Sequence, residues 1–317
     1  MKYLELRKDY LLDYYVIIAT ERAKRPDQFK KNEIQEEVKI DSFGPGNEKL
    51  TPEEIFRVND NNGNWKIRVF PNLYSAVGNA GKISISTDNT FYTYADAVGK
   101  HEIIVETPDI NQQFWDLSID RIKEVLDVFC YRMRELKKNA NTKYIVIFKN
   151  HKKEAGTSIV HTHWQLVSIN VIPPDILIAE NKVNEFLKKN YYCPYCGIIN
   201  SEKDSFRRIK ETNSTISFTP YASRFIMEAW VFPKRDIKEL TDLNDQEKYE
   251  IADQLLYITQ KLKLINAPFN ILIKQGVNNL HLHFEITPRL STWAGFEYET
   301  GIIINPISPE DAAKFYR

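Results

Sequence analysis

The chain has 317 residues, 43% of them hydrophobic, and its 43 basic and 43 acidic residues cancel to a formal net charge of zero. A chain of this length exceeds one typical domain, which indicates two domains or one long α/β unit. The balanced charge argues against a broad electrostatic surface for nucleic acid or anionic membranes. No stretch approaches the roughly 20 apolar residues of a membrane-spanning helix, and the charged N-terminus lacks a signal peptide pattern, so we expect a cytoplasmic protein.

The first half of the chain predicts a group of strands interrupted by one long helix. β-branched and aromatic residues indicate strands at 14–20, 65–70, 102–107, 144–150 and 159–172. Residues 111–140 carry apolar side chains at helical spacing and predict the helix. Cys130 lies on this helix, where we expect it to be a small core residue.

The second half repeats this order. Strand patterns occur at 215–221, 225–234, 269–276 and 280–290, and a helical pattern occurs at 240–267. Each half therefore ends on a strand that carries an H-x-H sequence. A repeat of about 150 residues predicts an α+β protein made of two fused domains. The segment 173–192 contains the join, and we place the domains at 1–180 and 181–317.

Two histidines in "SIVHTHWQLV" (158–167) stand out from an apolar strand pattern. On a strand, His161 and His163 would share one face, with Gln165 next in the row. Such buried polar side chains need partners, and a pair of hydrogen-bonded structural histidines would satisfy that need. A neutral imidazole is also a competent nucleophile toward phosphorus near neutral pH.

The residues before these histidines favour the catalytic alternative. Asn150, Ser158 and Gln165 supply neutral donors suited to phosphate oxygens. Gly156 permits a ligand to approach the backbone closely. A reaction at phosphorus is therefore the better hypothesis for this stretch.

A C-x-x-C sequence, Cys193 and Cys196, admits three interpretations. It could be a redox dithiol, although an amphipathic charged segment precedes it where a strand is expected. It could be two unrelated core cysteines. Half of a zinc site is the interpretation we favour, because two thiolates at this spacing can chelate one tetrahedral ion. Few cysteines and no disulfide framework also fit a reducing compartment.

The histidine stretch closely resembles the active-site signature of the galactose-1-phosphate uridylyltransferase branch of the histidine-triad superfamily, with Thr162 in the place of the usual proline. Five other segments resemble motifs of that family and occur in the family order. They are "ERAKRPDQF" (21–29), "FGPGNEKLTPEEI" (43–55), "WKIRVFPNLYSAV" (65–77), "GKHEIIVETPDI" (99–110) and "HFEITPRLSTWAGFEYETGIIINPISPEDAA" (283–313).

The resemblance implies two histidine-triad-like halves and a nucleotidyltransferase of nucleotide sugars. His163 would attack the α-phosphorus of a UDP-hexose, and the nucleotidyl-histidine would then react with a hexose 1-phosphate. Ser158, His161 and Gln165 would assist it. The implied substrate-binding residues are Arg22, Arg25, Asn72, Asn150, Gly156, Thr157, Phe296 and Glu297. A homodimer with shared active sites is also implied.

Other activities stay open at this point. ADP-glucose phosphorylase is the nearest alternative in the family, and dinucleoside polyphosphate phosphorylase is a weaker one. Leu73 follows Asn72 where many uridylyltransferases carry Asp, which weakens the uridine assignment. A non-catalytic nucleotide-binding regulator would be expected to have lost the nucleophile motif, and here His163, Ser158 and Gln165 are intact.

The resemblance also implies one structural zinc ion per chain. Relatives complete the C-x-x-C with a histidine after a P-K-x strand end and a histidine in the late strand. Those places read Asp236 and His281 here, with His283 as the alternative to Asp236. A carboxylate is an acceptable zinc ligand.

A second zinc site of the family is incomplete in this sequence. Its two cysteine places read Asp41 and Gly44, and its first histidine place reads Ile110. Asp41 and His161 alone are too few ligands for a structural zinc, which takes four. We therefore expect His161 to be hydrogen-bonded to Asp41 and to orient the strand that presents His163.

Overall fold

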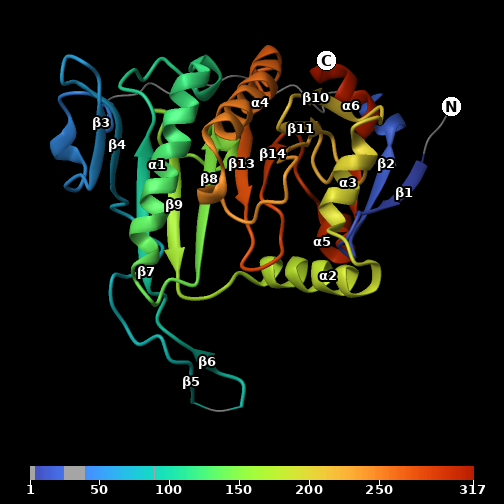
Figure 1. Ribbon diagram of the computed structural model, residues 1–317, viewed down its shortest axis with the longest axis horizontal. Coiled ribbons are helices and arrows are strands. Elements are labelled where there is room, and N and C mark those ends of the chain that lie inside the picture. The colour runs from blue at the N-terminus through green and yellow to red at the C-terminus, as the bar shows by residue number, and fades with distance from the viewer. Residues whose placement is uncertain (1–3, 25–39, 89) are drawn as a thin grey trace.

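The computed structural model describes residues 4–24, 40–88 and 90–317 (Figure 1). The strands are β1 Leu4–Lys8, β2 Tyr15–Ala19, β3 Phe56–Asn59, β4 Trp65–Pro71, β5 Ser86–Thr87, β6 Thr93–Tyr94, β7 Gly99–Val105, β8 Tyr144–His151, β9 His163–Ile169, β10 Arg208–Glu211, β11 Thr215–Phe218, β12 Ala229–Pro233, β13 Phe269–Lys274, β14 His283–Pro288 and β15 Ile303–Asn305. The α-helices are α1 Ile119–Lys137, α2 Pro174–Asn190, α3 Pro194–Glu202, α4 Asp245–Leu264, α5 Gly295–Thr300 and α6 Pro309–Tyr316. None of the helices in the described ranges is long and apolar enough to span a membrane.

One ten-stranded sheet runs through the molecule in the order β10-β11-β12-β14-β13-β8-β9-β7-β4-β3. Every strand pair in it is antiparallel. The two halves meet where β8 pairs with β13. Outward from that pair, each half repeats the same sequential order of strands, so the predicted α+β repeat is confirmed. The halves share one sheet, and the boundaries 1–180 and 181–317 stay a prediction; α2 occupies the segment where they were placed.

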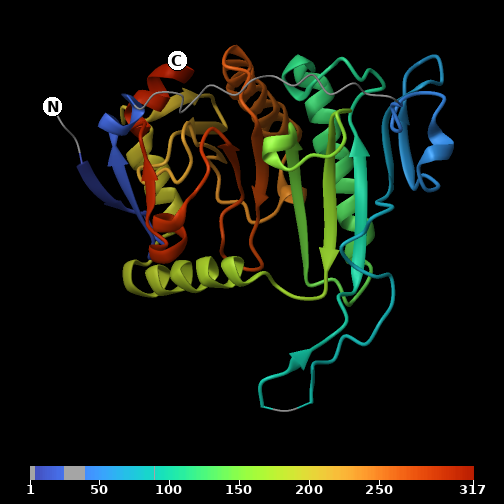
Figure 2. The same ribbon diagram turned by 180° about the vertical axis from the view of Figure 1, so that it is seen from behind.

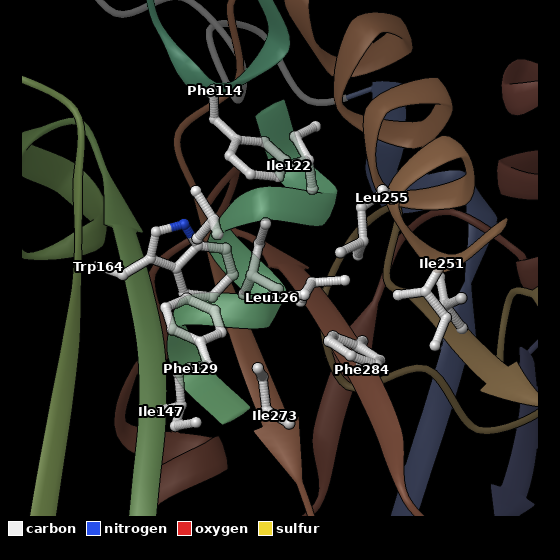
Figure 3. Packing of buried hydrophobic residues seen from close by; sticks show 14 of the residues in the cluster. Phe114, Ile122, Leu126, Phe129, Ile147, Trp164, Ile251, Leu255, Ile273 and Phe284 are labelled. Carbon is white, nitrogen blue, oxygen red and sulfur yellow. The ribbon is translucent and has the colours of Figure 1, made fainter. Parts of the chain in front are cut away.

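The core lies between one face of this sheet and the helices α1 and α4, which lie side by side across it (Figure 1). Trp164 of β9 and Phe284 of β14 point into this core with Phe129 of α1 and Leu255 of α4 (Figure 3). Cys130 is buried here as well, as predicted. Because side chains alternate along a strand, the neighbours of Trp164 and Phe284 point to the other face of the sheet.

That other face is covered differently in the two halves. In the second half, α2 and α3 pack on it through Ile176, Val183 and Tyr195. In the first half, Phe43 is the partly buried residue that packs on its small apolar cluster. Figure 2 shows that none of the described helices crosses β8 and β9 on this side. His163 and Gln165 of β9 therefore lie on a face of the sheet that none of the described helices crosses.

The sequence placed several boundaries differently from the structure. The strand expected at 159–172 begins only at His163, so His161 precedes β9 and does not belong to it. The helix expected at 111–140 begins at Ile119, because the side chain of Ser118 caps it by accepting from the Arg121 amide at 3.1 Å. The sequence pattern missed the short strands β1, β3, β10 and β15, which have few residues to show a period.

Candidate active site and metal site

His163, the first residue of β9, has the geometry of a nucleophile. Its Nδ1–H donates to the carbonyl oxygen of His161 at 2.8 Å. Its Nε2 has no hydrogen-bond partner among the described residues, and the Phe43 ring meets the imidazole edge-on at 5.3 Å. Burial, assisted by the charge of Lys149, lowers the pKa of His163 to about 4. At neutral pH the ring is therefore uncharged and offers the Nε2 lone pair.

His161 is held on both ring nitrogens. Its Nδ1 lies 3.0 Å from each carboxylate oxygen of Asp41, and its Nε2 donates to the carbonyl oxygen of Thr107 at 2.7 Å. A Cβ at Gly44 would lie 2.2 Å from Oδ2 of Asp41, so glycine is what leaves room for this carboxylate. The predicted hydrogen bond between Asp41 and His161 is confirmed. It fixes the backbone that carries His163.

Gln165 is linked to Asn72 through His101, a residue that the sequence analysis did not select. The amide of Ala76 donates to Nδ1 of His101 at 3.3 Å, so Nε2 carries the proton. Nε2 then donates to Oε1 of Gln165 at 2.9 Å and lies 3.1 Å from Nδ2 of Asn72. Burial lowers the pKa of His101, which keeps the ring neutral. In the sequence, His101 stands in the family-like segment "GKHEIIVETPDI". In the structure it lies two residues before Ile103, which pairs with Gln165.

A buried ion pair supports His163 from the core side, and the sequence analysis did not select it either. Lys149 and Glu106 are both fully buried and form an ion pair. Nζ of Lys149 also donates to Oγ1 of Thr162 at 2.7 Å and to the carbonyl oxygen of His163 at 3.1 Å. The Thr162 hydroxyl donates to Glu106. The sequence feature that could have indicated this buried pair is the lysine within the apolar strand "YIVIFKN".

The remaining predicted phosphate donors lie in the loop between β8 and β9, which leads into His163. Gly156 has a φ of 94°, which an L side chain rarely adopts. The side chain of Thr157 is used within the loop, where its hydroxyl donates to the carbonyl oxygen of Ile159 at 3.0 Å. Ser158 is exposed. In the described part of the chain, the backbone amides of residues 158–160 donate to no acceptor, so they are available to an anion.

Asn150 has a partner across the halves. Its side-chain oxygen accepts from Nδ2 of Asn270 at 2.8 Å, and Nδ2 of Asn270 also donates to the carbonyl oxygen of Ala155. This contact joins the end of β8 to β13 and to the loop that contains Gly156. The amide nitrogen of Asn150 is left as the donor that a ligand could use.

A second cluster of chemically active side chains lies in the other half. Cys193 precedes the first turn of α3 and Cys196 lies in that turn, Asp236 follows β12, and His281 precedes β14. Their potential ligand atoms all lie within 4.8 Å of one another. His283 does not belong to this group: its Nδ1 donates to the carbonyl oxygen of His281 at 2.9 Å, and its Nε2 faces Oε1 of Glu285 at 3.5 Å. The structure thus favours Asp236 over His283.

The donor set of this cluster fits a metal ion. Nε2 of His281 donates to the carbonyl oxygen of Pro233 at 3.0 Å, which leaves a lone pair on Nδ1. That Nδ1 is buried and has no hydrogen-bond partner. Burial and the neighbouring Cys193 raise the pKa of Cys196 to about 12, so a cation would be needed to hold both thiolates. The helix α2, and not a strand, precedes the cysteines, which disfavours the redox interpretation.

Comparisons with known proteins agree with this geometry. Residues 1–173 match the family model for galactose-1-phosphate uridyl transferase, N-terminal domain, and residues 107–314 match a domain of unknown function, DUF4921. The chain belongs to the galactose-1-phosphate uridylyltransferase family. Its members are nucleotidyltransferases, and the candidate metal site lies in the half that follows the H-x-H stretch of His161 and His163.

Two curated relatives span almost the whole chain. ADP-glucose phosphorylase of Arabidopsis thaliana is 30% identical over 99% of this chain and 92% of its own length. Galactose-1-phosphate uridylyltransferase of Thermotoga maritima is 27% identical over 99% of this chain and 98% of its own length. A crystal structure of the Arabidopsis ADP-glucose phosphorylase with bound ADP-glucose superimposes with a TM-score of 0.84 at 29% identity, covering 99% of this chain and 98% of that one.

Three of the residues that the family resemblance implies for substrate binding are not brought to His163 within this chain. Arg22 lies in the 3-10 helix Thr20–Lys24 that follows β2, and Arg25 lies outside the described residues. Phe296 and Glu297 lie on α5, where the Glu297 carboxylate accepts from the Ala294 amide at 2.9 Å. β2 and α5 lie in the half of the molecule opposite β9 (Figure 1).

Proposed function

We propose that this protein transfers a nucleotidyl group from a nucleotide sugar by way of a covalent bond to His163. The observation that carries the proposal is the state of that imidazole. Its Nδ1–H is committed to the His161 carbonyl, its pKa is lowered to about 4, and its Nε2 has no hydrogen-bond partner among the described residues. His161, in contrast, has both ring nitrogens in contact with acceptors.

The step is a displacement at the α-phosphorus. A bond forms between Nε2 of His163 and the phosphorus, while the bond from phosphorus to the oxygen of the departing sugar phosphate breaks. The electron pair leaves with that oxygen, so hexose 1-phosphate departs as an anion. A second phosphate-bearing acceptor then attacks the nucleotidyl-histidine and restores the free imidazole.

The surrounding groups stabilise charge on the phosphate and transfer no proton. Oε1 of Gln165 accepts from His101, which leaves the amide Nε2–H groups of Gln165 to donate to a phosphate oxygen. The amides of residues 158–160 and the Ser158 hydroxyl supply further fixed donors. Donors aimed beforehand at developing charge account for most of the acceleration in phosphoryl-type transfer.

ADP-glucose is the donor substrate we propose first. The ADP-glucose phosphorylase of Arabidopsis resembles this chain over nearly its full length, in sequence and in fold. Leu73, in the place of an acid that many uridylyltransferases carry, supports this choice. A UDP-hexose is the second candidate, favoured by the resemblance to the Thermotoga uridylyltransferase.

The complete active site is proposed to form between two copies of the chain. Arg22, Phe296 and Glu297 are implied substrate contacts, yet they lie in the half opposite His163. A homodimer in which each copy supplies these residues to the His163 of its partner would unite them. The Cys193–Cys196–Asp236–His281 cluster is proposed to hold one structural zinc ion, which would tie α3 to the ends of β12 and β14.

The direct test is to incubate the protein with ADP-glucose and with UDP-glucose. We expect release of glucose 1-phosphate and a stable mass increase of one nucleotidyl group per chain, labile to acid as a phosphoramidate is. His163→Asn should abolish the label. His283→Asn is the matched control, because His283 makes the same Nδ1 contact in the other half, and it should keep the label. Labelling that survives His163→Asn would place the nucleophile elsewhere.

A further inference from the structure

The two halves hold their strand histidines in the same way. His163 and His283 are each the first residue of a strand, β9 and β14, which are equivalent in the repeated strand order. Each Nδ1–H donates to the carbonyl oxygen of the histidine two residues earlier, at 2.8 Å and 2.9 Å. Two residues later, Gln165 in the first half corresponds to Glu285 in the second. The second half therefore carries the frame of a second phosphate site.

The loops before these strands differ in what their amides bind. Residues 277–280 stand at the same spacing from His283 as residues 157–160 do from His163. All four amides of 277–280 donate to the carboxylate of Glu180 on α2, at distances of 2.8 Å from Val277, 2.9 Å from Asn278, 3.0 Å from Asn279 and 3.2 Å from Leu280. The β13–β14 connection thus reaches α2 (Figures 1 and 2).

Glu180 is bound here as an anion. Its side chain is 4% exposed, and no cation pairs with it among the described residues. Burial alone would raise the pKa of this carboxyl, but the four amide donors outweigh burial and lower it. Consecutive backbone amides that converge on one point form a concave anion site, the arrangement proteins use for phosphate.

We propose that residues 277–280 form an oxyanion site of the phosphate-binding kind and that the carboxylate of Glu180 is its resident ligand. The comparison with residues 157–160 rests on the function proposed above, whereas the site itself rests on the four amide contacts to Glu180. Because Glu180 of α2 already accepts from those amides, an external phosphate cannot bind them while α2 is in place.

This arrangement explains why the second histidine is not a second nucleophile. A nucleotidyl donor would need its phosphate where Glu180 lies, and it would meet the carboxylate of Glu285 where the first half offers the neutral Gln165. Nε2 of His283 already faces Oε1 of Glu285 at 3.5 Å. A cavity of about 290 Å³ lined by His283, Glu285 and Ala179 lies next to α2. The second half therefore has an open volume beside His283, although Glu180 occupies the amides of residues 277–280.

The test removes the resident carboxylate and offers an oxyanion in its place. Glu180→Ala is compared with the wild type and with Glu185→Ala, a control on the same helix whose side chain is 70% exposed. Thermal unfolding is measured in sodium phosphate and in sodium chloride at equal ionic strength. We expect phosphate to raise the Tm of Glu180→Ala by about 2–5 °C more than that of either comparison protein, the size expected when phosphate is about tenfold above its dissociation constant.

The count of bound phosphate gives the second measurement. Equilibrium dialysis with labelled inorganic phosphate should find one more phosphate per chain in Glu180→Ala than in the wild type. Equal counts and equal Tm responses would overturn the proposal. If Glu180→Ala does not fold in chloride, recovery of the fold in phosphate supports the site and failure to recover overturns it. No enzymatic activity is measured, so the result is independent of whether the proposed transfer occurs.

Discussion

The imidazole of His161 and the carboxylate of Asp41 lie 3.0 Å apart, and they come from segments 120 residues distant in the chain. Because the other nitrogen of His161 donates to the Thr107 carbonyl, this ring bridges three segments directly before the nucleophile. This polar contact between two side chains thus orients the segment that leads into β9.

Replacing Asp41 should therefore weaken both the fold and the reaction. Asp41→Ala removes the acceptor of His161 and should cost about 1–3 kcal/mol, the range for hydrogen bonds to charged groups. We expect kcat to fall about tenfold or more, because an imidazole whose support has loosened is less often in line with the phosphorus. Urea unfolding and steady-state kinetics measure the two effects. Asp204→Asn, an exposed control, should change neither.

His163 should make the protein sensitive to acid. The pKa of His163 is about 4 in the folded chain and 6.5 when unfolded, so the unfolded state binds the proton more readily. Stability from this group is fully present above pH 6.5 and is lost as pH falls toward 4, by about 3 kcal/mol in all. His163→Asn has no such group. Between pH 7 and pH 4.5, the unfolding free energy of His163→Asn should fall less than that of the wild type. An equal fall would contradict the lowered pKa of His163.

Thr162 should be needed for its hydroxyl group. Thr162→Val keeps the shape but takes one hydrogen bond from both Lys149 and Glu106, at a cost of about 1–3 kcal/mol for buried groups left short of a partner. Thr162→Ser keeps the hydroxyl and should retain most of the stability and activity. Chemical denaturation of the two variants in parallel measures the difference. Equal losses would mean that the methyl group of Thr162 matters and the hydroxyl does not.

Only two of the three cysteines should affect the metal content of the protein. We expect elemental analysis to find one zinc ion per chain, and Cys193→Ser or Cys196→Ser to lower that content sharply. Cys130→Ser is the control, because Cys130 is buried in the core beside α4 and should lose some stability but no metal. A chelator should lower the Tm of the wild type. Full metal content in Cys193→Ser would remove this cluster as the site.

Shared active sites can be tested by mixing two inactive variants. The variant His163→Asn lacks the proposed nucleophile in every site, and Glu297→Gln lacks the proposed substrate-binding carboxylate in every site. In a mixed dimer, one site would regain an intact His163 from one copy and an intact Glu297 from the other. Random exchange of subunits between equal amounts should restore about a quarter of the wild-type activity. If mixing restores none while both variants are dimeric, each site is built by a single chain.

Several features of this protein are readable from local pattern. The repeated order of strands and helices, the H-x-H stretch before an apolar strand and the C-x-x-C pair all depend on residues close together in the chain. Hydrophobic period and residue chemistry suffice for the α+β repeat and for the interest in the H-x-H and C-x-x-C stretches. The choice of His163 and Gln165 rested on the family resemblance of the first stretch. None of these needed tertiary information.

Only the tertiary structure decided which distant groups complete each site. In the structure β9 begins at His163, and Asp236 rather than His283 joins the cysteines. His101 contacts Gln165, and the buried Lys149–Glu106 ion pair lies on the core side of His163. The tertiary structure also places Glu180 in the amides of residues 277–280. The contacts among these groups join segments about 40 to 100 residues apart. Such pairings follow from how strands register and helices pack, which a local pattern does not encode.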